Sequence, residues 1–567
     1  MKLAANAIVR VSNATMANRP PRELRSSYCR SASSLVLLLA CAQPVQAQAE
    51  DLPAPVTQSA GALATFQVNQ VRVEGNTLLS ASAVEAALAG ARGPGRTLID
   101  LNQAASQLQR AYRDAGYGGV LAFVPQQTLD GGTVLIRVVE GRLATVRVSG
   151  NQHFSSDNIR AGLPGLRAGS TPHVPEVDRD IQLSNENPAK DLKVTLMAGV
   201  KPGEIDAEVL VQDRKPLRYM LALDNTGNAQ TGHYRLTAGL QHANLSDRDD
   251  ILGAQFQTSP GHTDQVKLLG LGYRLPFYSR AASLDLFYAH SDVSSGVMQT
   301  LAGPLVFAGQ GRVLGGRVNL HLERSGGLDH RLGVGLDWRA YDNDCAFLDL
   351  GALGSAACGP AAVSAKVLPL VLSYTVQAQS AQLAWGGNAS LFANLGGSSS
   401  ATFDAARPGA SRHFIKTRLS GFGAVQLPLG FALKGDLETQ FSPHALLSGE
   451  QFGIGGGSSV RGYQERELTG DHGHLLRLEL QGPALSSAGM LLRPHLFIDQ
   501  GRVGRRKSAA CGADGAVSCR ISSVGAGMRM SVSERVTASL EWGRARDDAL
   551  QTESGDHRAH ALIQLAF

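Results

Sequence analysis

The sequence predicts a membrane β-barrel of about sixteen antiparallel strands that follows two small α/β modules. Three observations predict this fold. The chain opens with an export signal, a block of residues behind the signal is repeated once, and the remainder alternates between apolar and polar residues with no helical stretch. Alternation in segments of about ten residues is typical of strands that face lipid on one side and an aqueous lumen on the other.

Residues 1–49 are typical of a secretory signal peptide. Arginines precede the apolar run LVLLLACA, and Ala47-Gln48-Ala49 offers the small residues of a cleavage site. The run is too short to cross a bilayer, which takes about 20 apolar residues. We therefore expect cleavage after Ala49, with residues 50–65 as a short linker. Cys41 after LLLA suggests a lipoprotein site, but cleavage after Ala47-Gln48-Ala49 fits the sequence better. Met16 is an alternative start of the protein.

Composition narrows the class of protein. The chain has 64 glycines, 18% charged residues and a formal net charge of +5, which gives no reason to expect nucleic-acid binding. Behind the signal, the cysteines form two close pairs, Cys345 with Cys358 and Cys511 with Cys519. In an exported protein, such spacing favours two local disulfides over a metal site.

The first module, residues 66–143, is predicted to run strand, helix, helix, strand, strand. FQVNQVRVEGNTLL alternates as a strand, and SASAVEAALAG follows as a short helix behind a serine cap. The second helix should end at Gly116, which suits a left-handed cap. Its apolar face is expected to comprise Leu101, Ala104, Leu108, Ala111 and Ala115.

The second module, residues 144–216, repeats this order. VRVSGN at residues 146–151 matches VRVEGN at residues 71–76, and a helix, VPEVDRDIQLSNENP, precedes two further strands. Sheets of such modules have exposed edges, and an extended peptide can add to an edge as an extra strand.

Residues 217–567 are predicted to form the barrel, because a closed sheet leaves no backbone edge unsatisfied in lipid. The last strand, RAHALIQLAF, shows the two faces. Alternation assigns Ala559, Ala561, Ile563, Leu565 and Phe567 to lipid, and Arg558, His560, Leu562 and Gln564 to the lumen. In HLLRLELQGP, the same rule points Arg477 and Glu479 inward.

One long loop, residues 446–473, follows the eleventh predicted strand. Loops longer than about 15 residues are uncommon unless they are functional or disordered. This loop is rich in glycine, which permits positive φ and close approach of backbones, and it contains Arg461, a cation that needs a partner. By strand parity, both cysteine pairs fall in loops at the same outer end of the barrel.

Catalytic signatures are missing from the sequence. It has no HExxH, GxSxG, GxxxxGK[ST] or CxxC motif, and GIGGGS lacks the strand-to-helix context of a dinucleotide loop. We therefore expect no enzymatic activity, no cofactor and no metal.

The two repeats, the stretches SSVRGYQERELTGDHG and LFIDQGRV, and the terminal phenylalanine together resemble the outer-membrane transporters of two-partner secretion (TpsB, the haemolysin secretion/activation proteins). The resemblance covers essentially the whole mature chain. It implies that the repeats are periplasmic POTRA domains, that the barrel lies in the bacterial outer membrane, and that the long loop folds into the lumen. It also implies secretion of a large β-helical exoprotein, of haemolysin or adhesin type, that the POTRA domains bind.

The resemblance assigns site residues. We expect the loop motif to anchor to the receiving strand through an ion pair between Arg461 and Asp499, and the terminal Phe567 to be recognised by the barrel-assembly machinery. The VRGY loop motif corresponds to Val460, Arg461, Gly462 and Tyr463, and the FxDxG strand motif to Phe497, Asp499 and Gly501.

Two alternative functions fit the sequence less well. A barrel-assembly factor of the same superfamily would usually carry more than two POTRA domains, and a passive porin or outer-membrane enzyme leaves both modules unexplained. In the family that the sequence resembles, a helix that plugs the pore often precedes the first POTRA domain. Such a helix needs about 17 residues or more, so the linker, residues 50–65, is too short for it and departs from the family.

Overall fold

The computed structural model describes residues 64–567 apart from 129, 230, 293–295, 301–302, 308–309, 343–359, 361–362, 488, 508–509, 513–514 and 534. The expected signal peptide and the pair Cys345 and Cys358 lie outside the described residues. The chain divides into two compact units, one containing most of the first module and the other containing Glu140–Phe567. Among the described helices, none is long and apolar enough to cross a membrane.

The first module contains a three-stranded sheet in the order β2-β5-β4 and a separate pair, β1 with β3. Strand β2 runs parallel to β5. The elements are β1 (Phe66–Val68), β2 (Gln70–Glu74), α2 (Ala81–Leu88), η1 (Ala89–Ala91), β3 (Gly93–Arg96), α3 (Leu98–Asp114), β4 (Val120–Phe123) and β5 (Thr133–Glu140).

Three details of this module differ from expectation. The first strand is interrupted at Asn69, whose backbone nitrogen donates to the Gly132 carbonyl. The sequence GPGR forms β3 because it pairs with β1, although glycine and proline are poor strand formers. Helix α3 ends at Asp114, so Ala115 lies beyond it and is exposed, and Tyr112 is buried on the helix instead. Gly116 takes a left-handed φ of 90°.

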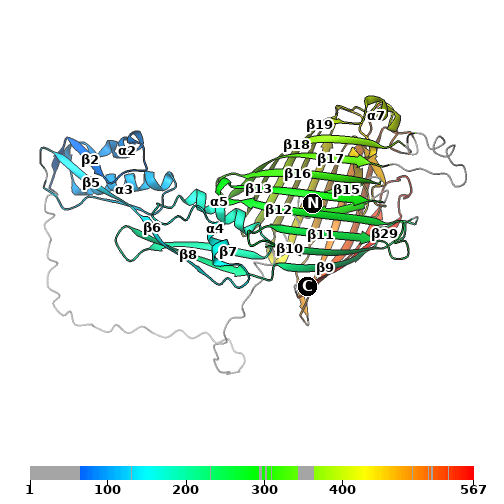
Figure 1. Ribbon diagram of the computed structural model, residues 1–567, viewed down its shortest axis with the longest axis horizontal. Coiled ribbons are helices and arrows are strands. Elements are labelled where there is room, and N and C mark those ends of the chain that lie inside the picture. The colour runs from blue at the N-terminus through cyan, green and yellow to red at the C-terminus, as the bar shows by residue number, and fades with distance from the viewer. Residues whose placement is uncertain are drawn as a thin grey trace, which may run out of the picture. The chain divides into compact units, whose positions relative to one another are not determined.

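The second module repeats this sheet in the order β6-β8-β7, again with its outer strand parallel to the central one. Helices α4 and α5 lie along one face of the sheet (Figure 1). Strand β6 begins at Arg142, slightly before the expected start at residue 144. The elements are β6 (Arg142–Ser149), α4 (Ser156–Ala161), α5 (Val174–Asn185), β7 (Lys190–Ala198) and β8 (Glu204–Asp213).

The rest of the chain forms a closed antiparallel barrel, and the expected sixteen strands are confirmed. Strand β29 pairs with β9 and closes the sheet. A short strand, β25 (Leu485–Ser487), pairs with β26 in a turn. The barrel strands are β9 (Leu217–Asp224), β10 (Arg235–His242), β11 (Ile251–Thr258), β12 (Lys267–Phe277), β13 (Ala282–Ser291), β16 (Gly311–His321), β17 (Leu328–Tyr341), β18 (Ala365–Gln379), β19 (Leu383–Gly397), β20 (Ile415–Gln426), β21 (Ala432–Phe441), β24 (His472–Gln481), β26 (Met490–Gly504), β27 (Ser518–Val532), β28 (Val536–Ala545) and β29 (His557–Ala566).

The two faces of the barrel wall follow the expected alternation. On β24, Leu476, Leu478 and Leu480 point outward with 40 to 42% of their surface exposed, whereas Glu479 is buried at 7%. Exposed leucines in this pattern suit a wall that lipid covers. The lumenal face is lined by charged and polar side chains, which must therefore find partners inside the barrel.

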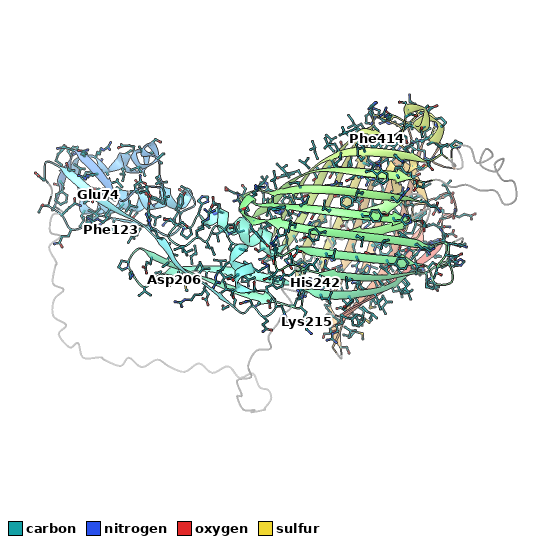
Figure 2. All side chains as sticks on the ribbon, viewed as in Figure 1. Glu74, Phe123, Asp206, Lys215, His242 and Phe414 are labelled. Carbon is teal, nitrogen blue, oxygen red and sulfur yellow. A yellow bond between two sulfur atoms is a disulfide. The ribbon has the colours of Figure 1, made fainter. Side chains whose placement is uncertain are left out.

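Long loops gather at one end of the barrel. Helix α7 (Ser400–Ala406) lies in the loop after β19, and Figure 2 labels Phe414 at the same end. Phe403 and Phe414 are fully buried and pack with Leu446, the first residue of the long loop. The outer end of the barrel therefore has its own apolar core, which supports the base of this loop.

The second module contacts the barrel at the end opposite to the long loops. The Glu186 carboxylate lies 3.3 Å from Arg274 and 2.8 Å from Arg331. Burial by itself would raise the pKa of Glu186, but Arg331, His321 and Arg274 outweigh burial and hold the pKa at about 2. The side chain of Asn187 also donates to the Ala243 carbonyl at 2.6 Å.

Candidate functional site: the lumenal loop

Residues 446–473, which we call the lumenal loop, have an ordered structure. A small hairpin, β22 (Phe452–Ile454) with β23 (Leu468–Gly470), closes the base of the loop. Ile454, Val460 and Tyr463 are fully buried and pack with side chains of the barrel wall. The loop therefore carries a core of its own that packs against the barrel wall.

Glycines shape the tip of this loop. Gly455, Gly456 and Gly462 have φ values of 111°, 98° and 94°, a region that disfavours other residues. A Cβ on Gly455 would lie 2.5 Å from the Gln464 carbonyl oxygen. The backbone turns back on itself here, so that Arg461 projects toward strand β26.

Arg461 meets Asp499 in a two-pronged ion pair. The Arg461 Nε and Nη2 atoms each donate to the Asp499 carboxylate at 2.7 Å. The backbone nitrogen of Arg461 adds a third bond at 3.1 Å. Arg461 is 2% exposed and Asp499 is 0% exposed. A planar guanidinium matches a carboxylate in this geometry, so the pair fixes orientation as well as distance.

Two further carboxylates complete the surroundings of Arg461. Its Nη1 atom lies 3.5 Å from Glu479 and 3.3 Å from Glu541. The guanidinium carbon lies 3.4 Å from the centre of the Phe497 ring, so Phe497 stacks on the cation. Strand alternation had already placed Glu479 in the lumen, whereas nothing in the sequence singled out Glu541 on β28.

The trio Glu479, His495 and Glu541 has ligand atoms within 4.8 Å of one another, a spacing that could hold a metal ion. The surrounding cations argue against this use. Arg529 donates to Glu479 at 2.8 Å and to Glu541 at 3.1 Å, and Arg461 faces both carboxylates. Guanidinium groups already neutralise the acids, so the trio completes an ion-pair network.

The other motif residues hold the loop to the wall through close contacts. The Gly462 nitrogen donates to His560 Nε2 at 3.1 Å, and a Cβ on the facing Gly543 would lie 2.8 Å from that nitrogen. The Tyr463 hydroxyl donates to the Asp547 carbonyl at 2.8 Å. A Cβ on Gly501 would come within 3.1 Å of Val460, so Gly501 makes room for the loop.

The outer half of the loop has anchors that the sequence did not suggest. Glu467 accepts from the Thr552 nitrogen at 2.8 Å and from its hydroxyl at 2.7 Å. Asp471 accepts from Arg407 Nη2 at 2.7 Å and from the Arg506 nitrogen at 2.7 Å. These partners come from three different outer loops. The lumenal loop is thus tied both to the wall and to the loops above it.

Of the expected disulfides, one falls within the described residues. Cys511, in the loop that follows β26, is bonded to Cys519 at the start of β27. Arg506 lies in this same loop and contacts Asp471 through its backbone nitrogen. The disulfide therefore constrains a loop that contacts the lumenal loop. The pairing of Cys345 with Cys358 stays a prediction.

The match to a known protein family spans most of the barrel. Residues 203–355 and 366–530 match the family of haemolysin secretion/activation proteins ShlB/FhaC/HecB. The chain belongs to this family. Residues 66–141 match the ShlB-type POTRA domain, so the first module is a POTRA domain. That the second module is also one is still a prediction, supported by its matching strand order.

Curated relatives are similar over most of their length. The outer membrane transporter CdiB of Dickeya dadantii (strain 3937) is 24% identical over 74% of this chain and 73% of that protein. The heme/hemopexin transporter protein HuxB of Haemophilus influenzae (strain 86-028NP) is 24% identical over 77% of this chain and 75% of that protein.

Two solved structures share the fold. CdiB from Escherichia coli has a TM-score of 0.73 at 20% identity and covers 91% of this chain and 93% of its own. CdiB from Acinetobacter baumannii has a TM-score of 0.65 at 17% identity, and the match covers 99% of this chain and 97% of that chain.

The family fixes the class of function and the location. The protein is an outer-membrane transporter of two-partner secretion, with its POTRA region in the periplasm and a secreted exoprotein as its partner. Members of the family are transporters. The family match favours export over barrel assembly and over a passive pore. The modules therefore face the periplasm, and the long loops face the cell exterior.

Proposed function

We propose that this transporter secretes one large β-helical exoprotein of haemolysin or adhesin type, and that the lumenal loop moves aside during export while no covalent chemistry takes place. The observation that carries the proposal is the buried ion pair between Arg461 and Asp499. A folded loop that is held by ionic bonds blocks the lumen, yet its bonds are reversible. Displacing the loop would open the path that a polypeptide needs.

The partner is bound through its unfolded N-terminal part by the periplasmic modules. This part of the proposal is supported by the sheet order β6-β8-β7, which leaves β6 and β7 as edge strands within the described chain. A strand edge offers unpaired backbone groups, and an added strand would bind mostly through its main chain. Such binding tolerates many sequences, as suits a carrier that handles a long unfolded segment.

Deletion of residues 144–216 tests this binding step. We expect the variant to lose export while its barrel still inserts. Because Asn187 and Glu186 contact the barrel, the amount of folded barrel must be measured in parallel, by the heat-dependent shift of its gel mobility. Normal export from a correctly inserted deletion variant would refute the proposed role of the second module.

The terminal residue, Phe567, is proposed as the signal that the barrel-assembly machinery reads. Its side chain is 62% exposed where β29 meets β9, and its backbone nitrogen donates to the Tyr219 carbonyl at 3.0 Å. Phe567→Ala should reduce the amount of assembled barrel. Ile563→Ala, which truncates another exposed side chain on β29, is the matched control. Equal assembly of both variants would contradict this role.

A further inference from the structure

Glu450 occupies a site on the lumen wall that no motif of the family resemblance marks. It lies at the start of the lumenal loop, in the short turn η5 (Ser448–Glu450), and is 0% exposed. Its carboxylate accepts from Arg339 Nη1 at 2.9 and 3.1 Å and from Lys416 Nζ at 2.5 Å. The Tyr341 hydroxyl also donates to it at 2.5 Å.

The site is built by several strands and not by one flexible contact. Lys416 on β20 is 1% exposed and also donates to the Glu450 carbonyl at 2.9 Å. Asp337 on β17 holds Arg339 at 2.7 Å. The centre of the Phe392 ring, on β19, lies 5.8 Å from the Arg339 guanidinium carbon and 5.2 Å from Lys416 Nζ.

Close packing at the neighbouring glycine supports the same conclusion. A Cβ on Gly449 would lie 2.1 Å from the Tyr341 ring. Any other residue at position 449 would push the turn away from the wall. The chain is thus shaped to bring Glu450 into this socket, which we define as Arg339, Tyr341 and Lys416.

The socket and the Arg461 site lie on different parts of the barrel wall. Strand β17 carries Arg339, and strand β28 carries Glu541. The socket as a whole spans β17 to β20, whereas the carboxylates around Arg461 span β24 to β28, so the two groups of strands are separate and β21 lies between β20 and β24. The lumenal loop is therefore bound to two separate parts of the wall.

The charges at the two sites are reversed. On the β24–β28 side the loop supplies a cation to wall carboxylates, and at the socket the loop supplies a carboxylate to wall cations. If Glu450 and Arg461 exchanged sites, each would meet charges of its own sign, and such contacts are strongly unfavourable where water is excluded. This reversal gives the loop a single orientation in the lumen.

We propose that Glu450 is a positioning residue that forms a second ionic anchor of the lumenal loop, so that the loop is held to two separate parts of the barrel wall and closes the lumen only while both anchors hold. This inference rests on the proposed function of the loop as the element that moves. With one anchor broken, the loop pivots on the other and the lumen opens.

The test compares Glu450→Gln with Glu465→Gln in the purified full-length transporter. Glu465 is a glutamate of the same loop that accepts from the Gly457 nitrogen at 2.7 Å and has no ion pair among the described residues. Spin labels on Ser458→Cys and Ser380→Cys, both exposed positions, report the distance from the loop tip to the wall turn after β18. Cys345→Ser and Cys358→Ser remove other labelling sites.

For Glu450→Gln, we expect the displaced-loop population to rise at least about tenfold, because the two cations lose their carboxylate. Open-channel events in a planar bilayer should become more frequent in parallel. Glu465→Gln should match the parent, and Glu450→Asp, which keeps the charge, should fall between parent and Glu450→Gln. Unchanged distances and conductance in folded Glu450→Gln protein would overturn the anchor.

A further variant separates the anchor from a general loss of charge. If the two residues act as a pair, Glu450→Gln combined with Lys416→Met should displace the loop no more than Glu450→Gln alone. Additive effects would overturn the pairing. Neither readout needs the exported partner. Secretion is measured separately: a displaced loop with normal secretion would refute the proposed role of the loop in export and leave the second anchor standing.

Discussion

Arg461 binds Asp499 through three hydrogen bonds, two from its guanidinium and one from its own backbone nitrogen. Removing the arginine side chain leaves one of these bonds in place, whereas removing the aspartate abolishes all three. Because both groups are buried, removing the arginine leaves Asp499 without its cation, whereas removing the aspartate leaves Arg461 near Glu479 and Glu541 but without its two-pronged partner. The two residues are therefore unequal members of one pair.

Arg461→Ala and Asp499→Ala should each abolish secretion while folded barrels remain in the membrane. Breaking a shielded pair costs about 3 to 5 kcal/mol, against about 0 to 1 for an exposed pair. The double variant should be scarcely worse than Asp499→Ala, as measured by secretion and by protease protection of the loop. Arg520→Ala, on the exposed face of β27, is the control. Independent, additive losses would show that the residues do not act together.

Asp471→Asn should loosen the outer half of the lumenal loop. The carboxylate accepts hydrogen bonds from Arg407 and from two backbone nitrogens, those of Leu446 and Arg506. Hydrogen bonds to a charged group are worth about 1.5 to 3 kcal/mol each. We expect faster cleavage of the loop by protease added outside the cell. Asp404→Asn, at an exposed carboxylate of α7, should cleave at the parental rate.

The disulfide between Cys511 and Cys519 should be dispensable for export. Its sequence separation is 8, so closing the loop contributes about 2 to 3 kcal/mol by the loop-entropy estimate. Mass spectrometry of unreduced peptides should recover this pair and the pair Cys345 with Cys358. Crossed pairs or free thiols would contradict the loop assignment. Cys511→Ser combined with Cys519→Ser should secrete normally, because neither sulfur contacts the Arg461 pair.

The second periplasmic module should lose stability as pH rises from about 4 to about 6. Asp180 on α5 is buried and accepts from the Gly165 nitrogen at 2.7 Å. Burial raises its pKa from 3.8 to about 6. The folded module therefore binds a proton that the unfolded chain has released over this range, so the stabilisation is full below the unfolded pKa and is lost as pH passes the folded one.

Each pKa unit corresponds to 1.36 kcal/mol, so this loss amounts to about 3 kcal/mol at most. Urea unfolding of the periplasmic region in the full-length transporter, followed by limited proteolysis at pH 4 to 7, measures it. Asp180→Asn, which stays uncharged, should remove the dependence. A pH slope that persists in Asp180→Asn would assign the effect to another group.

The sequence by itself determined the architecture, because the signals involved are local. Alternation with a period of two follows from strand geometry, so the inward position of Glu479 and the outward position of Leu478 could be predicted from neighbours alone. The Arg461 and Asp499 pairing also came from the sequence, but only because the motifs resemble a known family. Residue propensity does not indicate a strand at GPGR, where pairing with β1 outweighs the preferences of glycine and proline.

Only the tertiary structure decided which charges meet inside the lumen. Glu450 lies 111 positions from Arg339 in the chain, and Arg461 meets Glu541 on a strand far along the barrel. Residues so far apart become neighbours only when the sheet closes on itself, since closure decides which walls the loop can reach. Inside that enclosed space a charge must find an opposite charge, and the closed barrel determines which partner it finds.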